Sequence, residues 1–273
     1  MISLVTATYG RIDEIRVLLD SLSAQTYQNF ELIIVDQNSH TYVQDLVELY
    51  PQLNIKYIRS SIKGLSINRN IGLKYCQGNI IAFPDDDCFY SPDVLKHVNQ
   101  LFSNNNEFAF LYTEVVDPQT KKLFIKSSTK PISRKEIIKY CISYNIFIRK
   151  NSQISFDERL GVGTYYGSGE ETDYLWAYLS HPDIGLCVPN VYIYHPQNSA
   201  SSITNHQRTR SYALGFGALF KKEIIKRKNY SYIILFIYYC CRSIGGLLLT
   251  KNKKFHYYNL IGRMKGIFTF PIK

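Results

Sequence analysis

The stretch Asn79–Cys88, which reads NIIAFPDDDC, joins a short apolar run to three consecutive carboxylates. The apolar run has the length and composition of a buried strand, so the acids follow at the point where that strand would end. Like charges crowded together are costly unless a cation or hydrogen-bond donors offset them. The stretch is therefore consistent with a site for a hard divalent cation and phosphate oxygens. The alternative is an acidic turn in which an Asp caps the next helix.

Strand-like and helix-like segments alternate on both sides of this stretch. Strands are expected at Ile2–Thr8, Glu31–Asp36, Asn54–Arg59 and Asn79–Phe83, and further along at Phe108–Val116, Tyr144–Arg149 and Gly185–His195. Helices are expected at Asp13–Ala24, Val43–Leu49, Leu65–Tyr75 and Pro92–Phe102. This order predicts an α/β fold with a mostly parallel sheet flanked by helices.

The carboxyl ends of the first strands carry polar residues. Thr6–Tyr9, Asp36–Ser39 and Asp85–Asp87 each stand at the end of an expected strand. Ligands of open α/β sheets bind beyond these ends, so the three groups should line one edge of the sheet. The chain has no GxGxxG motif after the first strand and no GxxxxGK[ST] motif. A dinucleotide-binding fold and a P-loop NTPase are therefore poorly supported.

The composition is that of a folded protein with a sizeable core. The chain has 273 residues, of which 45% are hydrophobic and 14% aromatic. This length suits one large domain, or one domain with a C-terminal appendage. Six scattered cysteines have no CxxC pair, and a strand-like run begins at Ile2. We therefore expect no signal peptide before the fold, and free thiols in a reducing cytoplasm.

The net charge of +10 is concentrated in the last quarter of the chain. Residues 204–273 hold 14 of the 32 Lys and Arg but only one of the 22 acids, Glu223. Such a pattern is compatible with a nucleic-acid binder. It is equally compatible with a cytoplasmic enzyme whose tail rests on an anionic membrane.

An apolar segment, residues 230–249, lies within this basic tail and has nearly the length of a membrane span. Its one charge, Arg242, and the pair Gly245–Gly246 argue against a span. The basic runs Lys221–Lys228 and Lys251–Lys254 on either side favour a segment that lies in the membrane interface. We expect a helical hairpin docked on the bilayer. The alternative is a tail helix packed on the rest of the chain or on a second subunit, which would make a homo-oligomer.

The motifs of the chain, taken together, resemble those of glycosyltransferase family 2, the nucleotide-sugar transferases of the GT-A fold. They are Ser3–Arg11, the strand ending at Asp36, Gly64–Gly72, Asp85–Asp87 and Gly169–Asp173. Each motif alone is a weak signal, but five in the family's order are a strong one. The resemblance extends from Ser3 to about His195.

The resemblance implies a division of the chain and an activity. Residues 1–203 would form the catalytic domain, with a nucleotide-sugar-binding half over 1–105 and an acceptor half over 106–203, and residues 204–273 a basic helical tail. The implied activity is inverting, metal-dependent transfer of a sugar from a nucleotide-sugar, most simply UDP-linked, to a hydroxyl. The acceptor would be a glycan or lipid-linked molecule of cell-surface polysaccharide synthesis, reached from the cytoplasmic face of the plasma membrane.

The resemblance also implies which residues hold the nucleoside. The nucleobase and ribose would be cradled by Thr6, Ala7, Thr8 and Tyr9, with Arg11 near the base. Asp36 would accept a hydrogen bond from the imide N–H of the base, as suits uracil. By themselves, Thr8 and Asp36 are more typical of residues that cap the helices that follow.

The phosphate and metal side is implied in the same way. Arg69 would reach the diphosphate or the carboxylates, and Ser66 of the same motif would join the donor-binding residues. Asp85 or Asp86 would hold the ribose, and Asp87 would ligate Mg²⁺ or Mn²⁺. On its own, an arginine such as Arg69 is more often a solvated helix charge.

Histidines are candidates to complete the metal site. The resemblance makes His195, at the end of the last strand, a third ligand or a phosphate contact, since neutral imidazole suits Mn²⁺. A lone histidine at a strand end is more often a surface or packing residue. His181 and His206 have weaker claims.

The acceptor-side motif departs from the family's usual Gly-Glu-Asp, whose Asp is the general base. Glu171 stands at that position, and a glutamate can take the proton of an acceptor hydroxyl. Asp173 and Glu170 are alternatives, and either glutamate also suits a helix N-terminus. Trp176 and Tyr165–Tyr166 are candidates to stack on the acceptor sugar, although core packing is favoured for Trp176.

Three other functions remain open from the sequence. A sugar nucleotidyltransferase also uses an α/β sheet and carboxylate-held Mg²⁺, but the turn Thr8–Arg11 is a poor version of its Gly-rich loop. The Gly-Glu-Glu departure is compatible with a non-catalytic member that binds nucleotide or glycan within a synthase complex. A nucleic-acid binder rests on the basic tail alone, and we expect no nucleic-acid partner.

Overall fold

The computed structural model describes residues 1–128, 130–179, 184–196 and 205–272, which divide into two compact units. The first unit consists of Met1–Lys63, Ile67–Ser155 and Ala177–Gln197. The second unit consists of Gly64–Ser66, Phe156–Trp176 and Asn198–Lys273.

This division differs from the predicted one. Residues 156–176, expected in the catalytic domain, group with the basic tail rather than with the sheet. The predicted boundary between residues 203 and 204 lies outside the described residues. The tail therefore belongs to a compact unit that also contains the motif Gly169–Asp173.

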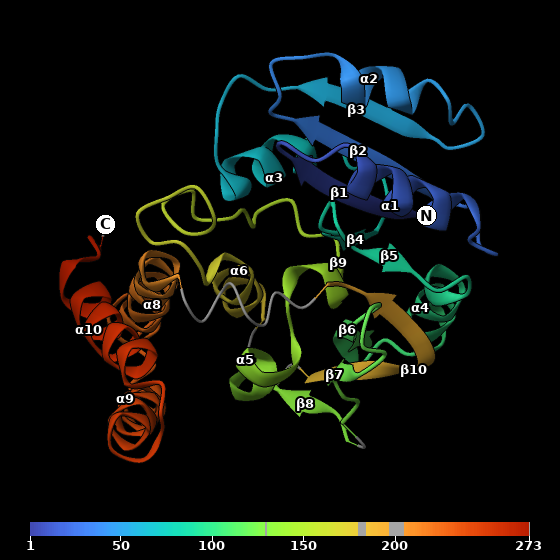
Figure 1. Cartoon of the computed structure of the whole chain (residues 1–273). Helices are drawn as coiled ribbons and strands as arrows, with labels where there is room; N and C mark the ends of the chain where they lie inside the picture. Colours follow the sequence, from blue (N-terminus) through green and yellow to red (C-terminus); the bar gives the residue numbers. More distant parts are fainter. Residues whose placement is uncertain (129, 180–183, 197–204, 273) are drawn as a thin grey trace. The chain divides into compact units, whose positions relative to one another are not determined.

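A sheet of ten described strands forms the centre of the first unit (Figure 1). In spatial order its main path is β3 (Ile55–Arg59), β2 (Phe30–Asp36), β1 (Ile2–Thr8), β4 (Ile80–Ala82), β9 (Ile146–Arg149), β6 (Phe108–Val116), β10 (Ile184–Tyr194) and β5 (Phe89–Tyr90). Two short strands pair beside this path, β7 (Leu123–Ile125) with β6 and β8 (Ile132–Ser133) with β10.

The sheet is parallel in one half and mixed in the other. Strands β3, β2, β1 and β4 pair in parallel, as expected for the alternating first part of the chain. Strand β9 then runs antiparallel to both β4 and β6, and β10 returns parallel to β6. The expectation of a mostly parallel sheet therefore holds for the first half only. The apolar pattern of a strand does not encode the direction in which it pairs, because both of its faces can be buried in either arrangement.

Helices cover both faces of the parallel half. The helical elements that lie wholly in the first unit are α1 (Asp13–Ser23), α2 (Tyr42–Val47), α4 (Val94–Asn104), α5 (Ile137–Tyr140) and the 3₁₀ turns η1 (Arg134–Glu136) and η2 (Ser143–Asn145). Alternate strand residues such as Leu4 and Leu32 share one buried core with the apolar stripes of α1, α2 and α4. The first half of the chain thus forms a layered α/β arrangement.

Helix α3 (Leu65–Leu73), which begins in the second unit, contacts the opposite face of the sheet. Gly72 lies against Val5, Ile33 and Val35, and a Cβ at this position would come within 2.4 Å of Val5 Cγ1. The close approach of this helix to the sheet therefore requires a glycine at position 72.

The second unit is mainly helical (Figure 1). Its helical elements are the first part of α6 (Glu170–Tyr178), then α8 (His206–Lys221), the π turn η3 (Lys222–Lys226), α9 (Tyr232–Leu249) and α10 (Lys253–Thr269). Helices α8 and α10 approach closely through small residues. A Cβ at Gly217 would lie 2.2 Å from the Arg263 carbonyl oxygen, and one at Gly266 would lie 2.1 Å from that of Leu214.

Helix α9 is the one helix among the described residues that is long and apolar enough to cross a membrane. Only 22% of its apolar window is buried within the protein. Its inner face packs on α10, where Arg263 donates hydrogen bonds to the Tyr239 carbonyl oxygen and to Ser243 Oγ. One side of α9 therefore packs on α10 within the tail, and the other side is exposed.

Candidate donor and metal site

The acidic triplet follows β4, and its loop is tied to the end of β1. Because β1 and β4 pair in parallel, their carboxyl ends emerge at the same edge of the sheet. Thr6 Oγ1 donates a 3.1 Å hydrogen bond to the Pro84 carbonyl oxygen, and Thr8 Oγ1 donates a 2.8 Å bond to Asp86 Oδ2. The two threonines therefore hold the triplet in place rather than capping a helix.

Arg11 bridges two of the three acids. Its Nη1 lies 2.8 Å from Asp86 Oδ1 and is also paired with Asp87 Oδ2. Burial raises the pKa of Asp86 to about 6, although Arg11 and Thr8 act in the opposite direction. Burial therefore makes Asp86 easier to neutralise than a solvated carboxylate.

Asp85 is held from two sides. The guanidinium of Arg69, a residue only 1% exposed, lies 2.7 Å from Asp85 Oδ1, and Ser143 Oγ donates to the same oxygen at 3.2 Å. Arg69 reaches the triplet as expected, and it is a buried charge paired with a carboxylate instead of a solvated one.

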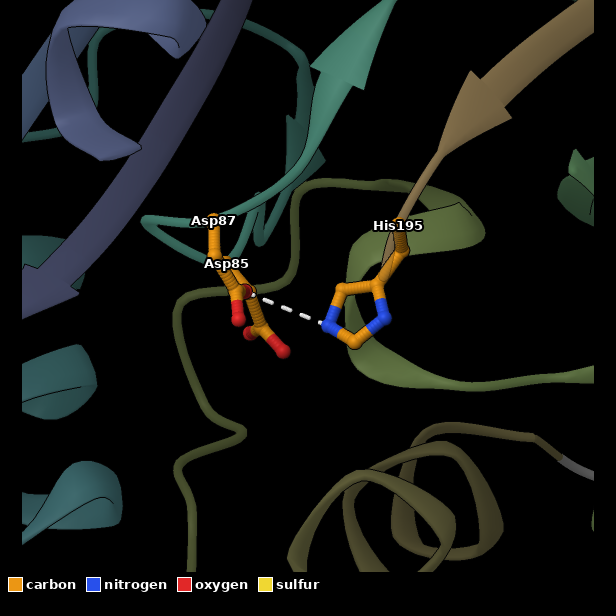
Figure 2. A group of neighbouring side chains, drawn as sticks. All are labelled: Asp85, Asp87 and His195. Atoms are coloured by element: carbon orange, nitrogen blue, oxygen red, sulfur yellow. Dashed lines mark ion pairs between the residues drawn. The ribbon is translucent and has the colours of Figure 1, made fainter. Parts of the chain in front are cut away.

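Asp87 faces His195, as Figure 2 shows. His195 Nε2 lies 3.2 Å from Asp87 Oδ1, and the imidazole is stacked on the Tyr144 ring at a centroid distance of 4.3 Å. Burial acts to raise the pKa of Asp87, but hydrogen bonds and charge from His195 and Arg11 outweigh it and hold that pKa below its usual range. The Asp87 carboxylate is therefore ionised at neutral pH.

The donor atoms of Asp85, Asp87 and His195 form a set that fits a metal ion. One ligand atom from each lies within 4.8 Å of the others. Two carboxylate oxygens and an imidazole nitrogen suit Mn²⁺ and, through the oxygens, Mg²⁺. The three residues come from different parts of the chain, two from the loop after β4 and one from the end of β10.

Asp36 is fully buried at the end of β2. It accepts hydrogen bonds from Asn38 N at 2.9 Å and from the Tyr57 hydroxyl at 2.8 Å. Burial, followed by this contact with Asp36, raises the pKa of Tyr57 to about 12. Asn38 Oδ1 in turn accepts from Gly10 N at 2.8 Å, where the backbone has a φ of 72°. Asp36 therefore orders the loop after β1, and its contact with a base imide stays a prediction.

Residues at the end of β1 and directly after it differ in exposure. Ala7 is half-buried, and the ring of Tyr9 is 60% exposed with Lys63 Nζ 3.6 Å from its centroid. Lys63 also donates to the Gln37 carbonyl oxygen. These contacts give the predicted nucleoside side an exposed aromatic ring beside a cation.

Several residues of this site have no signal in the sequence. Ser143 and Tyr144 lie in η2, although a strand is expected from Tyr144. Ser143 meets Asp85, and Tyr144 meets His195, only through the fold. Lys63 and Asn38 follow strand ends, so the rule that ligands bind beyond such ends points to them, but nothing separates them from other polar loop residues.

The predicted acceptor-side acids belong to the second unit. Glu170 is buried and Glu171 is half-buried at the start of α6. Asp173 is buried and paired with two cations, at 2.5 Å from Lys222 Nζ and 2.8 Å from Arg227 Nη2. A general base needs a carboxylate oxygen that the acceptor hydroxyl can approach, whereas both oxygens of Asp173 are ion-paired.

Other predicted residues of the second unit have structural contacts. Ser66 Oγ donates a 2.6 Å bond to the Leu160 carbonyl oxygen, so Ser66 holds the loop before α6. Trp176 packs edge-on against Phe220 and Tyr232, which confirms the preference for core packing.

The remaining aromatic and histidine candidates are dispersed. Tyr165 is exposed and Tyr166 is packed on Phe270. His206 begins α8 and is stacked on Tyr258. His181 lies outside the described residues.

The acids and two arginines meet beside the ends of β1 and β4, and a histidine reaches them from the end of β10. The mixed α/β fold with its central sheet flanked by helices is similar to that of GT-A glycosyltransferase structures. The family model "Glycosyl transferase family 2" matches residues 3–158, more than half of the chain. The protein therefore belongs to glycosyltransferase family 2 and is a glycosyltransferase.

Curated relatives are named as sugar transferases. The chain is 26% identical to an uncharacterized glycosyltransferase of Haemophilus influenzae over 100% of this chain and 94% of that protein. It is 29% identical to an Escherichia coli UDP-Glc:alpha-D-GlcNAc-diphosphoundecaprenol beta-1,3-glucosyltransferase, WfaP, over 52% of this chain and 57% of that protein. The chain thus matches nearly the whole of one relative and little more than half of the other.

Solved structures share the fold. A crystal structure of Staphylococcus aureus TarS 1–349 has a TM-score of 0.63 at 19% identity, covering 97% of this chain and 80% of that one. A Pyrobaculum calidifontis mannosyltransferase in complex with GDP-Man and Mn²⁺ has a TM-score of 0.61 at 13% identity, covering 82% and 64%. At these identities the likeness is one of fold.

Proposed function

We propose that the protein transfers a sugar with inversion from a UDP-sugar to a hydroxyl of a lipid-linked glycan, in a metal-dependent reaction of surface-polysaccharide synthesis. The observation that carries this proposal is the cluster of Asp85, Asp87 and His195, with Arg11 and Arg69 beside it. Relatives named for UDP-Glc and a diphosphoundecaprenol acceptor, and a TarS structure holding UDP-GlcNAc, support the donor and acceptor classes.

On the donor side, the chain's residues hold the nucleoside diphosphate. Tyr9 and Lys63 offer a ring and a cation beside the base, and Asp86 holds the ribose. Asp85, Asp87 and His195 would hold the cation, which when bound would supply positive charge against the departing diphosphate. Arg69 keeps Asp85 in place and adds charge near the phosphates.

On the acceptor side, Glu171 is our choice for the general base. It takes the proton of the acceptor hydroxyl while that oxygen attacks the anomeric carbon. The bond from this carbon to the diphosphate breaks through an oxocarbenium-like state, and UDP leaves. We assign Asp173 a structural role because both of its oxygens are ion-paired.

Ligand-induced thermal stabilisation tests the donor class. A ligand that binds the native state raises the unfolding midpoint by mass action. We expect UDP and UDP-sugars with Mn²⁺ to raise the midpoint by several degrees, and GDP-, CMP- and dTDP-sugars to raise it less. Omitting Mn²⁺ should abolish most of the shift. A larger shift with another nucleotide would refute the UDP assignment.

We also propose that the tail places the enzyme on the inner face of the plasma membrane. Ile234, Ile237 and Leu248 on α9 are 76%, 53% and 75% exposed, and they recur at helical spacing. Among residues 205–272, the single acid is the buried Glu223, so the exposed charges of the tail are positive. An apolar face with basic surroundings fits an anionic lipid surface.

Vesicle flotation tests this membrane contact. The double variant Ile234→Glu/Leu248→Glu should bind phosphatidylglycerol vesicles at least about tenfold more weakly, because it loses two apolar side chains that would be buried in the lipid. Leu49→Glu, at a position 64% exposed in the first unit, is the matched control and should float like the wild type. If the wild type is a dimer in solution and the double variant is a monomer, the partner that covers the exposed face of α9 is a second copy of the chain. Retention on DNA at matched salt would favour a nucleic-acid partner.

A further inference from the structure

A buried lysine lies where α8 passes into the π turn η3. Lys222 is 5% exposed, and its Nζ lies 2.5 Å from Asp173 Oδ2 and 2.7 Å from Asp157 Oδ2. It thereby links the loop before α6 to α6 itself. A buried charge is costly unless paired, and π turns occur often at functional sites.

The pairing continues around the π turn. Arg227, directly after η3, lies 2.8 Å from Asp173 Oδ1 and 3.1 Å from Glu223 Oε2. Glu223 is fully buried and also accepts a hydrogen bond from Asn229 Nδ2 at 3.1 Å. Asp173 is thus held by two cations from the tail, each on a different carboxylate oxygen.

The chain directly before α6 is also seated on α8. Gly167 N donates to the Ser211 carbonyl oxygen at 3.1 Å, and Ser168 Oγ donates to that of Tyr212 at 2.8 Å. A Cβ at Gly215 of α8 would lie 2.2 Å from the Ser168 carbonyl oxygen. The backbone leading to α6 therefore rests on α8 with no space for a side chain between them.

We propose that Lys222, assisted by Arg227, is a positioning residue for the first turn of α6. This inference rests on the proposed function, because the first turn carries Glu170 and Glu171. Asp173 follows Glu171 by two residues, so fixing both oxygens of Asp173 fixes the rotation of the helix that presents the base. The tail then builds the acceptor side of the enzyme in addition to any membrane contact.

The effect on catalysis follows from geometry. A base that takes a proton must stand within hydrogen-bond reach of it, and a displacement of about 1 Å can cost about 10²-fold in rate. Binding of the nucleotide should not depend on Lys222, because Asp85–Asp87 and His195 belong to the first unit. A positioning role therefore predicts a loss in kcat with unchanged affinity for UDP.

Lys222→Met is the test, because it removes the ammonium group that links Asp157 to Asp173 and leaves each of these two carboxylates with one other cation. Asp157 keeps Arg159, at 2.6 Å, and Asp173 keeps Arg227. Lys96→Met, at an exposed lysine of α4 in the first unit, is the matched control. We expect K222M to lower kcat about 10²-fold with donor KM and the UDP-induced midpoint shift unchanged. Hydrogen exchange of the amides of residues 170–176 should become faster in K222M and not in K96M.

The proposal is overturned if folded K222M keeps a kcat within about threefold of K96M and the same hydrogen exchange over residues 170–176. If K222M does not fold, Lys222→Arg takes its place, since it keeps the buried charge but changes its shape. A positioning role then predicts lower kcat with normal UDP binding, and wild-type kcat would refute it. If the wild type turns over no donor, the proposed function fails, but hydrogen exchange in K222M still decides whether Lys222 orders α6.

Discussion

Asp87→Ala should lower the turnover of UDP-sugars about 10³-fold and remove its dependence on Mn²⁺. Asp87 is the ionised carboxylate that faces His195, and its loss leaves the cluster with one carboxylate and one imidazole. Stabilisation of a departing diphosphate by a cation contributes several kcal/mol, and each 1.36 kcal/mol corresponds to a factor of ten in rate. The measurement is UDP release at a series of Mn²⁺ concentrations.

The control for Asp87→Ala is Glu107→Ala, which removes an exposed acid of the same unit. It should leave turnover and the Mn²⁺ requirement unchanged. Asp87→Ala should also lose the Mn²⁺-dependent part of the UDP-induced thermal shift. Full turnover in folded Asp87→Ala would show that the cation, if any, is held elsewhere. Unchanged turnover together with a lost thermal shift would show that Asp87 contributes to the affinity for the nucleotide and not to catalysis.

The clustering of polar residues at one sheet edge was largely predictable, because parallel strands impose their geometry on the residues that follow them. Thr8 and the triplet Asp85–Asp87 are far apart in sequence, but the alternation of strands and helices predicts that both stand at one sheet edge. Their contact at 2.8 Å between Thr8 and Asp86 agrees with that prediction. The contacts of Arg69 and His195 with the triplet could not be derived from the same rule and came from the family resemblance.

The partners that complete these contacts were not predictable. Ser143 and Tyr144 touch Asp85 and His195 because β9 enters the sheet between β4 and β6, and strand order depends on contacts distant in sequence. No local pattern specifies such an insertion.

The tail shows a second limit of prediction from sequence. Its positive charge and its apolar segment are visible in the composition, which favours a proposed contact with a membrane. Lys222 is one of many lysines in that tail. Only the fold reveals that its side chain is buried between Asp157 and Asp173. Composition therefore describes the surface of the tail and misses its part in building the acceptor side.

Glu171→Gln should lower kcat for transfer by about 10²- to 10⁴-fold while leaving UDP binding intact. Glutamine has the size of glutamate and can still hydrogen-bond the acceptor, but it cannot take the proton. The donor KM should stay within about twofold, since the donor-binding residues belong to the first unit. The measurement is initial-rate kinetics with a lipid-linked acceptor, together with a pH–rate profile that should lose its acid limb.

Two further variants decide between the acids of this motif. Glu170→Gln should reduce kcat less than Glu171→Gln, and a larger loss would move the base to Glu170. Glu171→Asp restores the family's Gly-Glu-Asp and shortens the side chain by one methylene, so it should keep a proton acceptor at altered reach and retain part of the activity. If Glu171→Asp were as inactive as Glu171→Gln, the distance from the carboxylate to the acceptor hydroxyl would affect kcat as strongly as the presence of a proton acceptor. The rotation of α6, which Lys222 is proposed to fix, should then affect kcat equally strongly. If both were fully active, Glu171 would not be the base.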